Sequence, residues 1–185
     1  CHPADSGQEF DASIAGAHVI PARSKQLKGV VYTLDGASVK PGEKPSVDFT
    51  VKDGSGAALD ANKFDFMEIT IEYPATDYTT RITENPNQIT TPPAAPFARK
   101  ATLTDLGGGK FRYTFSVAID PSWKGTVGVG MAAYKNATIK ANFGKDAVVR
   151  EGNVNPVIYV SLDGTKADPR RTVVKRENCN QCHLD

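Results

Sequence analysis

The sequence predicts an all-β fold, arranged as an antiparallel Greek-key or split β-barrel or as a sandwich-like domain. Hydrophobic and polar residues alternate with a period of two along several stretches, as they do in strands that bury one face. Glycine and aspartate lie between these stretches in combinations typical of tight turns. No stretch sustains a helical period, so we expect helix only in short turns.

Alternation is clearest in three stretches, at residues 47–51, 67–73 and 111–119. Further strands are expected at residues 29–34, 101–106, 125–134, 157–162 and 171–175. Turns are expected at residues 35–36, 53–56, 107–109 and 163–164. The pattern therefore predicts about eight strands.

Two segments depart from this pattern. Residues 85–96 include four prolines, which remove backbone donors, so we expect a long surface loop there. Residues 1–25 are expected to be a tether that precedes the first strand. Residues 53–62 carry acidic and amide side chains without the spacing of an EF-hand, and we expect a hairpin loop rather than a calcium site.

The run Cys179-Asn180-Gln181-Cys182-His183 has the CxxCH pattern of covalent haem attachment. Two thiols at this spacing can add to the two vinyl groups on one edge of the porphyrin, and the next imidazole then reaches the iron. A zinc site or a redox disulfide is the alternative. A zinc site would need further ligands, and the remaining Cys and His residues all lie near the other end of the chain: Cys1, His2 and His18.

The pair Cys1-His2 resembles the last two residues of a second CxxCH motif. Haem attachment would use all three cysteines, whereas disulfide pairing leaves one over. We therefore expect a β domain with haem-binding termini and haem c as cofactor, with parts of at least two haem sites. The expected organisation is residues 1–25 as the end of an upstream haem module and tether, 26–172 as the β domain, and 173–185 as the start of a downstream haem module.

Charge and composition exclude several other classes of protein. The net charge is +1, from 22 basic and 21 acidic residues that are interspersed, so no basic stripe for nucleic acid is present. No apolar run reaches the roughly 18 residues that a membrane-spanning helix needs. No Ser-His-Asp grouping and no glycine-rich loop opening a helix is legible. These observations favour a non-catalytic electron carrier over an enzyme.

Several stretches together resemble the OmcA/MtrC-like outer-membrane decahaem c-type cytochromes: Cys1-His2 with residues 5–30, then 45–53, 73–79 and 170–183. The resemblance implies split β-barrel domains that alternate with pentahaem modules at the outer-membrane surface, facing the extracellular medium; a periplasmic location is the alternative. Implied partners are the adjacent haem modules of the same chain, other outer-membrane cytochromes or a porin complex. Implied electron acceptors are extracellular metal oxides or flavins, and the full-length protein would have metal reductase activity.

The haem motifs give each candidate site residue a role. Cys179 and Cys182 would form the thioether links of one haem, with His183 as its proximal ligand. Cys1 would be a thioether link of another haem, with His2 as its proximal ligand. His18 is then the candidate distal ligand, because bis-histidine ligation needs an imidazole outside the CxxCH motif. The alternative for His18 is an ordinary loop histidine with a hydrogen-bonded side chain.

Three further residues with side chains of a kind used in redox proteins fit the core better. Met67 and Met131 lie on the apolar side of their strand patterns, and Trp123 follows a turn at Asp120-Pro121. The rival function, from another class, is an immunoglobulin-like binding or adhesion module of a secreted protein. Its terminal cysteines would then hold zinc or be free.

Overall fold

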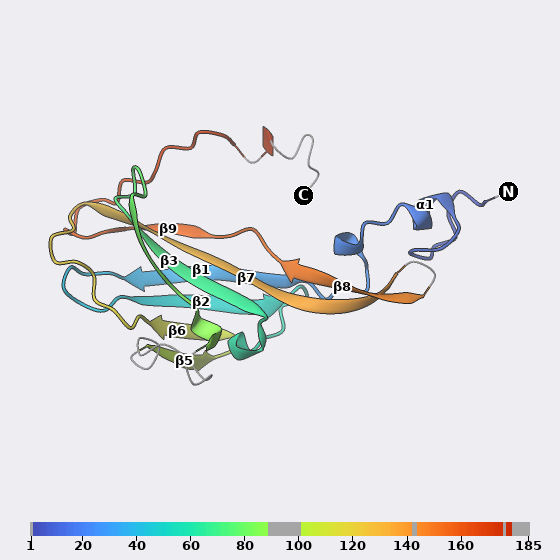
Figure 1. The fold of residues 1–185 in the computed structure, drawn as a ribbon, viewed down its shortest axis with the longest axis horizontal. Helices are drawn as coiled ribbons and strands as arrows, with labels where there is room; N and C mark the ends of the chain where they lie inside the picture. Colours follow the sequence, from blue (N-terminus) through green and yellow to red (C-terminus); the bar gives the residue numbers. More distant parts are fainter. Residues whose placement is uncertain (1, 89–100, 142–143, 176, 179–185) are drawn as a thin grey trace.

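Two antiparallel β-sheets pack face to face in the computed structural model, which describes residues 2–88, 101–141, 144–175 and 177–178 (Figure 1). The first sheet has the strand order β1-β2-β6-β5. The second sheet has the order β4-β3-β7-β8, and β9 also pairs with β7. All of these pairings are antiparallel.

The strands of the first sheet are β1 (Val30–Ser38), β2 (Ser46–Asp53), β5 (Thr102–Gly107) and β6 (Lys110–Thr114). The strands of the second sheet are β3 (Phe66–Tyr73), β4 (Thr80–Glu84), β7 (Thr126–Ala141), β8 (Lys145–Gly152) and β9 (Val157–Ser161). The described helices are short: α1 (Ile14–Ala17) and the 3-10 turns η1 (Pro21–Arg23), η2 (Ala61–Lys63) and η3 (Pro86–Gln88). Within the described ranges, no helix is long and apolar enough to cross a membrane.

The main core lies between the two sheets and is built from alternating residues of strands in both sheets. Val47, Phe49 and Val51 of β2 are fully buried, and Phe49 stacks on Phe111 of β6 with ring centroids 5.6 Å apart. Burying one such side chain contributes about 1.5–3 kcal/mol to folding. Met67 and Met131 also lie in this core, as predicted.

The all-β prediction is confirmed, and the architecture is that of a sandwich. In the part of the chain that the structure describes, the two sheets do not close into a barrel. The predicted strands at 29–34, 47–51, 67–73, 101–106, 125–134 and 157–162 are all present. The turns at 53–56, 107–109 and 163–164 also lie between or beyond strands, as expected.

Three sequence predictions need correction, two of strands and one of a turn. The strand predicted at 111–119 ends at Thr114, because the backbone N–H of Ser116 turns to Glu84 of β4. The turn predicted at 35–36 is wrong, since β1 continues to Ser38 through a shift in register between Leu34 and Gly36. Residues 171–175 form no strand.

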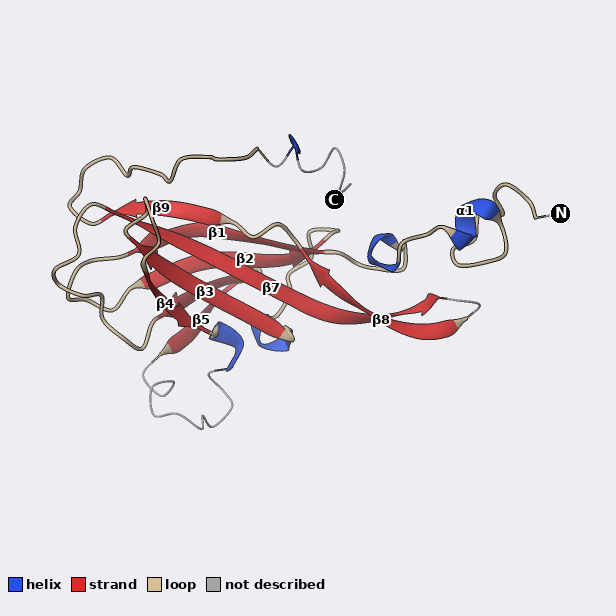
Figure 2. Cartoon of the chain, turned by 45° about the horizontal axis from the view of Figure 1, so that its top comes forward, coloured by secondary structure: helices blue, strands red, loops and turns tan. Residues whose placement is uncertain are grey.

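Other differences concern strands that the pattern did not indicate. β4 and β8 were not predicted, and β7 extends seven residues past its predicted end at residue 134. The added length of β7 pairs with β8 to form a two-stranded ribbon that projects from the sandwich (Figure 2). The predicted loop at 85–96 begins with η3, and its residues 89–96 lie outside the described residues.

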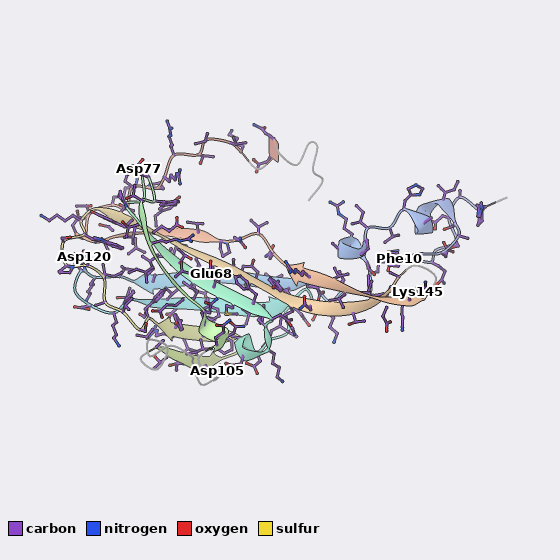
Figure 3. The ribbon with its side chains drawn as sticks, viewed as in Figure 1. Phe10, Glu68, Asp77, Asp105, Asp120 and Lys145 are labelled. Atoms are coloured by element: carbon purple, nitrogen blue, oxygen red, sulfur yellow. The ribbon has the colours of Figure 1, made fainter. Side chains whose placement is uncertain are left out.

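A second, smaller core joins the N-terminal segment to this ribbon. Phe10 is only 8% exposed and packs with Ile139 and Ala141 of β7 and Val149 of β8. Figure 3 shows Phe10 beside the tip of the ribbon near Lys145. Val19 and Leu27 extend the cluster, so the segment predicted as a tether has packing contacts of its own.

Candidate functional site

The structure describes two of the six predicted site residues. Cys1, Cys179, Cys182 and His183 lie outside the described residues. His2 is exposed near the N-terminal end of the chain. His18 is exposed too, and it lies at the C-terminal end of α1. The geometry therefore bears on His18, the candidate distal ligand.

The imidazole of His18 is held in one orientation and one tautomer. Its Nδ1 lies 2.7 Å from the backbone carbonyl oxygen of Ile14. A carbonyl oxygen only accepts hydrogen bonds, so Nδ1 carries the proton in this contact. In the neutral imidazole Nε2 then has a free lone pair, which is the arrangement found in histidines that bind metals.

The helical turn that carries His18 is capped by a carboxylate network. The side chain of Ser13 accepts a hydrogen bond from the backbone N–H of Gly16, at 3.0 Å. The Asp11 carboxylate accepts from the backbone N–H of Ser13 at 2.9 Å and from its hydroxyl at 2.6 Å. The hydroxyl of Ser6 donates to the other Asp11 oxygen at 2.5 Å. The hydrogen bond from the Ser13 hydroxyl, followed by that from Ser6, lowers the pKa of Asp11.

Gly16 is the residue that makes room for this network. A Cβ at position 16 would lie 2.1 Å from Oδ1 of Asp11 and 2.6 Å from the backbone oxygen of Gln8. No side chain fits at those distances without displacing backbone. Glycine at this position therefore lets the carboxylate of Asp11 lie against the turn that ends at His18.

A second carboxylate ties the same segment to residues 24 and 25. Glu9 accepts from the hydroxyl of Ser24 at 2.6 Å and from the backbone N–H of Lys25 at 2.7 Å. The hydrogen bond from Ser24 is the largest cause of the lowered pKa of Glu9. Because Phe10 follows directly and is buried in the small core, these bonds fix the turn carrying His18 relative to the ribbon.

This arrangement presents one imidazole nitrogen as a ligand from a preorganised turn. A histidine that ligates a haem iron does so through one accessible ring nitrogen, and Nε2 is the nitrogen that His18 would offer. Within the described ranges, no group of three or more His, Cys, Asp or Glu side chains gathers to hold a metal ion by itself. Any metal bound at His18 would therefore need ligands from elsewhere.

The other redox candidates are core residues. Met67 is fully buried and Met131 is 2% exposed, both between the sheets. The indole of Trp123 stacks on the ring of Tyr73 with centroids 4.4 Å apart and an interplanar angle of 8°. In the loop at 53–62, Oδ1 of Asp53 accepts from the backbone N–H groups of Ser55 and Ala57, so this carboxylate caps the turn.

Sequence reasoning identified His18 but missed the residues that hold it. Asp11, Ser13 and Gly16 give one local signal, the spacing of an Asp and a Ser just ahead of a short helical turn. No protein-family model matches the chain, and no curated protein matches it either.

Proposed function

We propose that this chain is a segment of a multihaem c-type cytochrome that carries electrons outside the cytoplasmic membrane, with the β domain as a scaffold between haem modules. The observation that carries the proposal is the CxxCH motif at residues 179–183. The fixed tautomer of His18 supports it, since a second axial ligand is what a bis-histidine haem requires.

Each predicted site residue has a stated part in this function. Cys179 and Cys182 would bind one haem covalently and His183 would ligate its iron. Cys1 would supply one thioether link to a second haem, with His2 as an iron ligand. His18 would offer Nε2 as a further iron ligand. Haem supplies the one-electron chemistry when it is bound. Two imidazole ligands favour a lower reduction potential than a histidine and methionine pair.

The shape of the domain supports the proposed scaffold role. The N-terminal segment lies beside the ribbon, and the segment after β9 turns back above β9 at the opposite end of the sandwich (Figure 1). A rigid sandwich between the two segments would hold the haems of adjoining modules at set positions. The partners proposed for the whole protein are adjacent haem modules, other outer-membrane cytochromes or a porin complex, with metal oxides or flavins as acceptors at the cell surface.

A second candidate function is an immunoglobulin-like binding or adhesion module. The open two-sheet arrangement favours it, because such sandwiches commonly serve as secreted binding domains. Under this alternative the cysteines would be free or bind zinc, and His18 would be a loop histidine. Covalent haem content separates the two functions.

The test is to express the full chain in a host that matures c-type cytochromes and to record the pyridine haemochrome spectrum of the denatured protein. The cytochrome function predicts the spectrum of thioether-linked haem. A Cys179→Ser, Cys182→Ser double variant is the matched control and should lose the haem of that motif. A matured wild-type sample without covalent haem would leave the binding module as the better account.

A further inference from the structure

The described segment after β9 turns back past the connection between β3 and β4 and then runs above β9 (Figure 1). Leu162 still pairs with the domain, since its backbone N–H donates to the carbonyl of Gly125 at 2.7 Å. Figure 1 shows the following residues turning back along the sandwich. Figure 3 places Asp77, in the turn between β3 and β4, where this exit segment passes.

A cation and an aromatic ring join the exit segment to that turn. The guanidinium carbon of Arg170 lies 4.6 Å from the ring centroid of Tyr78. An arginine over an aromatic face at this distance is attracted by the ring quadrupole. The Tyr78 hydroxyl donates to the hydroxyl of Tyr159 in β9 at 3.2 Å, so the ring is held from its far end.

The side chain of Tyr78 packs against the surface of the second sheet. Its φ angle is +54°, a left-handed conformation that is strained for tyrosine. Its ring covers Gly128 of β7, where a Cβ would come within 2.9 Å of the tyrosine hydroxyl. Burial, followed by the bond with Tyr159, raises the pKa of Tyr78, so its hydroxyl stays protonated.

A hydrogen bond from the backbone to a side chain lies two residues before Arg170. The N–H of Asp168 donates to Oγ1 of Thr126, at the start of β7, at 2.9 Å. For residues 166–175, this bond and the Arg170 contact are the two attachments to the β domain among the hydrogen bonds, ion pairs and ring contacts of the described residues. Both attachments therefore lie in one short stretch.

The position of these attachments sets how many residues separate the β domain from the CxxCH motif. Cys179 is nine positions after Arg170, so an extended chain reaches at most about 30 Å from that residue. Without the Arg170 contact the nearest attached residue is Asp168, eleven positions before Cys179, and the reach grows to about 40 Å. If the Asp168 hydrogen bond opens as well, the nearest attached residue is Leu162, seventeen positions before Cys179, and the reach is about 60 Å. Electron transfer between haems weakens steeply with separation, so this difference matters to a carrier.

We propose that Arg170, seated on Tyr78, is a positioning residue that clamps the exit segment and limits where the haem of Cys179 and Cys182 lies relative to the second sheet. The proposal rests on the proposed function for the haem itself. The contact between Arg170 and Tyr78 involves described residues alone. An experiment can therefore disprove this contact without disproving the haem function, and the reverse.

The first experiment measures the clamp without using the haem. Hydrogen exchange of the Asp168 amide is followed in the full chain and in Arg170→Gln, which removes the cation and keeps a long polar side chain. Loss of one exposed cation–π contact should speed exchange at Asp168 about threefold. Arg171→Gln is the matched control, because the structure gives that neighbour no ring contact, and it should leave exchange unchanged. Equal exchange in all three proteins would overturn the clamp.

The second experiment measures the position of the haem. In the matured, oxidised full chain, the paramagnetic iron shifts amide NMR signals of the second sheet by amounts set by its position. Arg170→Gln should shrink these pseudocontact shifts by averaging over a wider range, while Arg171→Gln should not. Tyr78→Leu, which removes the ring, should act like Arg170→Gln. Faster exchange with unchanged shifts would contradict the positioning role, and a chain without haem would reject the proposed function while leaving the exchange result valid.

Discussion

Nδ1 of His18 and the carbonyl oxygen of Ile14 are 2.7 Å apart, so the backbone of α1 fixes which nitrogen of the imidazole carries its proton. Nε2 is thereby left as the available ligand atom on an exposed side chain. The hydrogen bond between Ser13 and Asp11, together with the burial of Phe10 in the small core, holds this helical turn in place. The consequences can be tested residue by residue.

Replacing His18 by Ala should convert one haem of the matured protein from low-spin six-coordinate to high-spin or open coordination, because the distal imidazole is lost. Absorption and electron paramagnetic resonance spectra report the spin state. Ile20→Ala is the control, since Ile20 is 55% exposed and carries no ligand atom. Unchanged spectra for every haem in His18→Ala would show that His18 is a loop histidine.

Replacing Gly16 by Ala should disturb the same haem from a distance. The added Cβ meets Oδ1 of Asp11 at 2.1 Å and backbone at 2.6 Å, and overpacking of this kind costs about 1–3 kcal/mol. We expect faster amide exchange over residues 13–18 and a partial high-spin signal. Gly36→Ala is the matched control, because nothing lies within 4 Å of its Cβ. A fully low-spin Gly16→Ala protein would mean that the turn does not position His18.

Acid should loosen the hydrogen bonds that hold the N-terminal segment together at Glu9 and Asp11. The folded-state pKa values of Glu9 and Asp11 lie below their ordinary values of 4.5 and 3.8. Their contribution to stability is therefore present above those ordinary values and is lost as pH falls through the lowered folded values. Amide NMR signals of Ser24 and Lys25 should report detachment below about pH 4. Glu9→Gln should remove most of the pH dependence at these two amides, and an identical profile in that variant would contradict the assignment.

Glu84 should contribute strongly to the stability of the sandwich. Its carboxylate accepts from the Tyr113 hydroxyl at 2.6 Å and from the N–H and hydroxyl of Ser116, joining β4 of the second sheet to the end of β6 in the first. Burial, followed by the hydrogen bond to Glu84, raises the pKa of Tyr113. Truncation to Ala would leave these partly buried donors without their acceptor and should cost about 2–3 kcal/mol in urea unfolding.

Glu43→Ala is the control for Glu84. Its ion pair with Lys40 is 65% exposed on each side chain, and pairs of that kind contribute little. If Glu84→Ala lowers the free energy of unfolding no more than Glu43→Ala does, the Glu84 carboxylate does not link the two sheets.

The sequence predicted the strands whose inward residues are uniformly apolar, such as β2 with Val47, Phe49 and Val51. It could not predict β8, because the run from Lys145 to Gly152 is rich in charge and Val148 faces solvent at 70% exposure beside the buried Val149. Residues 171–175 have strand-forming side chains, yet Val173 is 72% exposed and no strand pairs with it in the described chain. Strand propensity alone does not supply a partner.

The candidate site likewise contains residues that the sequence could indicate and contacts that it could not. His18 could be selected from the sequence because few histidines are present and two others lie in haem-type motifs. The Asp11 and Gly16 contact, and the Arg170 and Tyr78 contact, depend on how the chain folds back on itself over turns and long separations. Period-two alternation carries no information about such contacts, so only the folded structure could supply them.

The most direct test of the proposed function is the mass of one peptide. Trypsin cuts after Arg176, and the C-terminal peptide 177–185 then contains both cysteines of the CxxCH motif. The cytochrome function predicts that this peptide from the matured full chain carries the mass of one haem, bound through both thiols. The unmodified peptide mass, with both thiols free to react with an alkylating reagent, would contradict it.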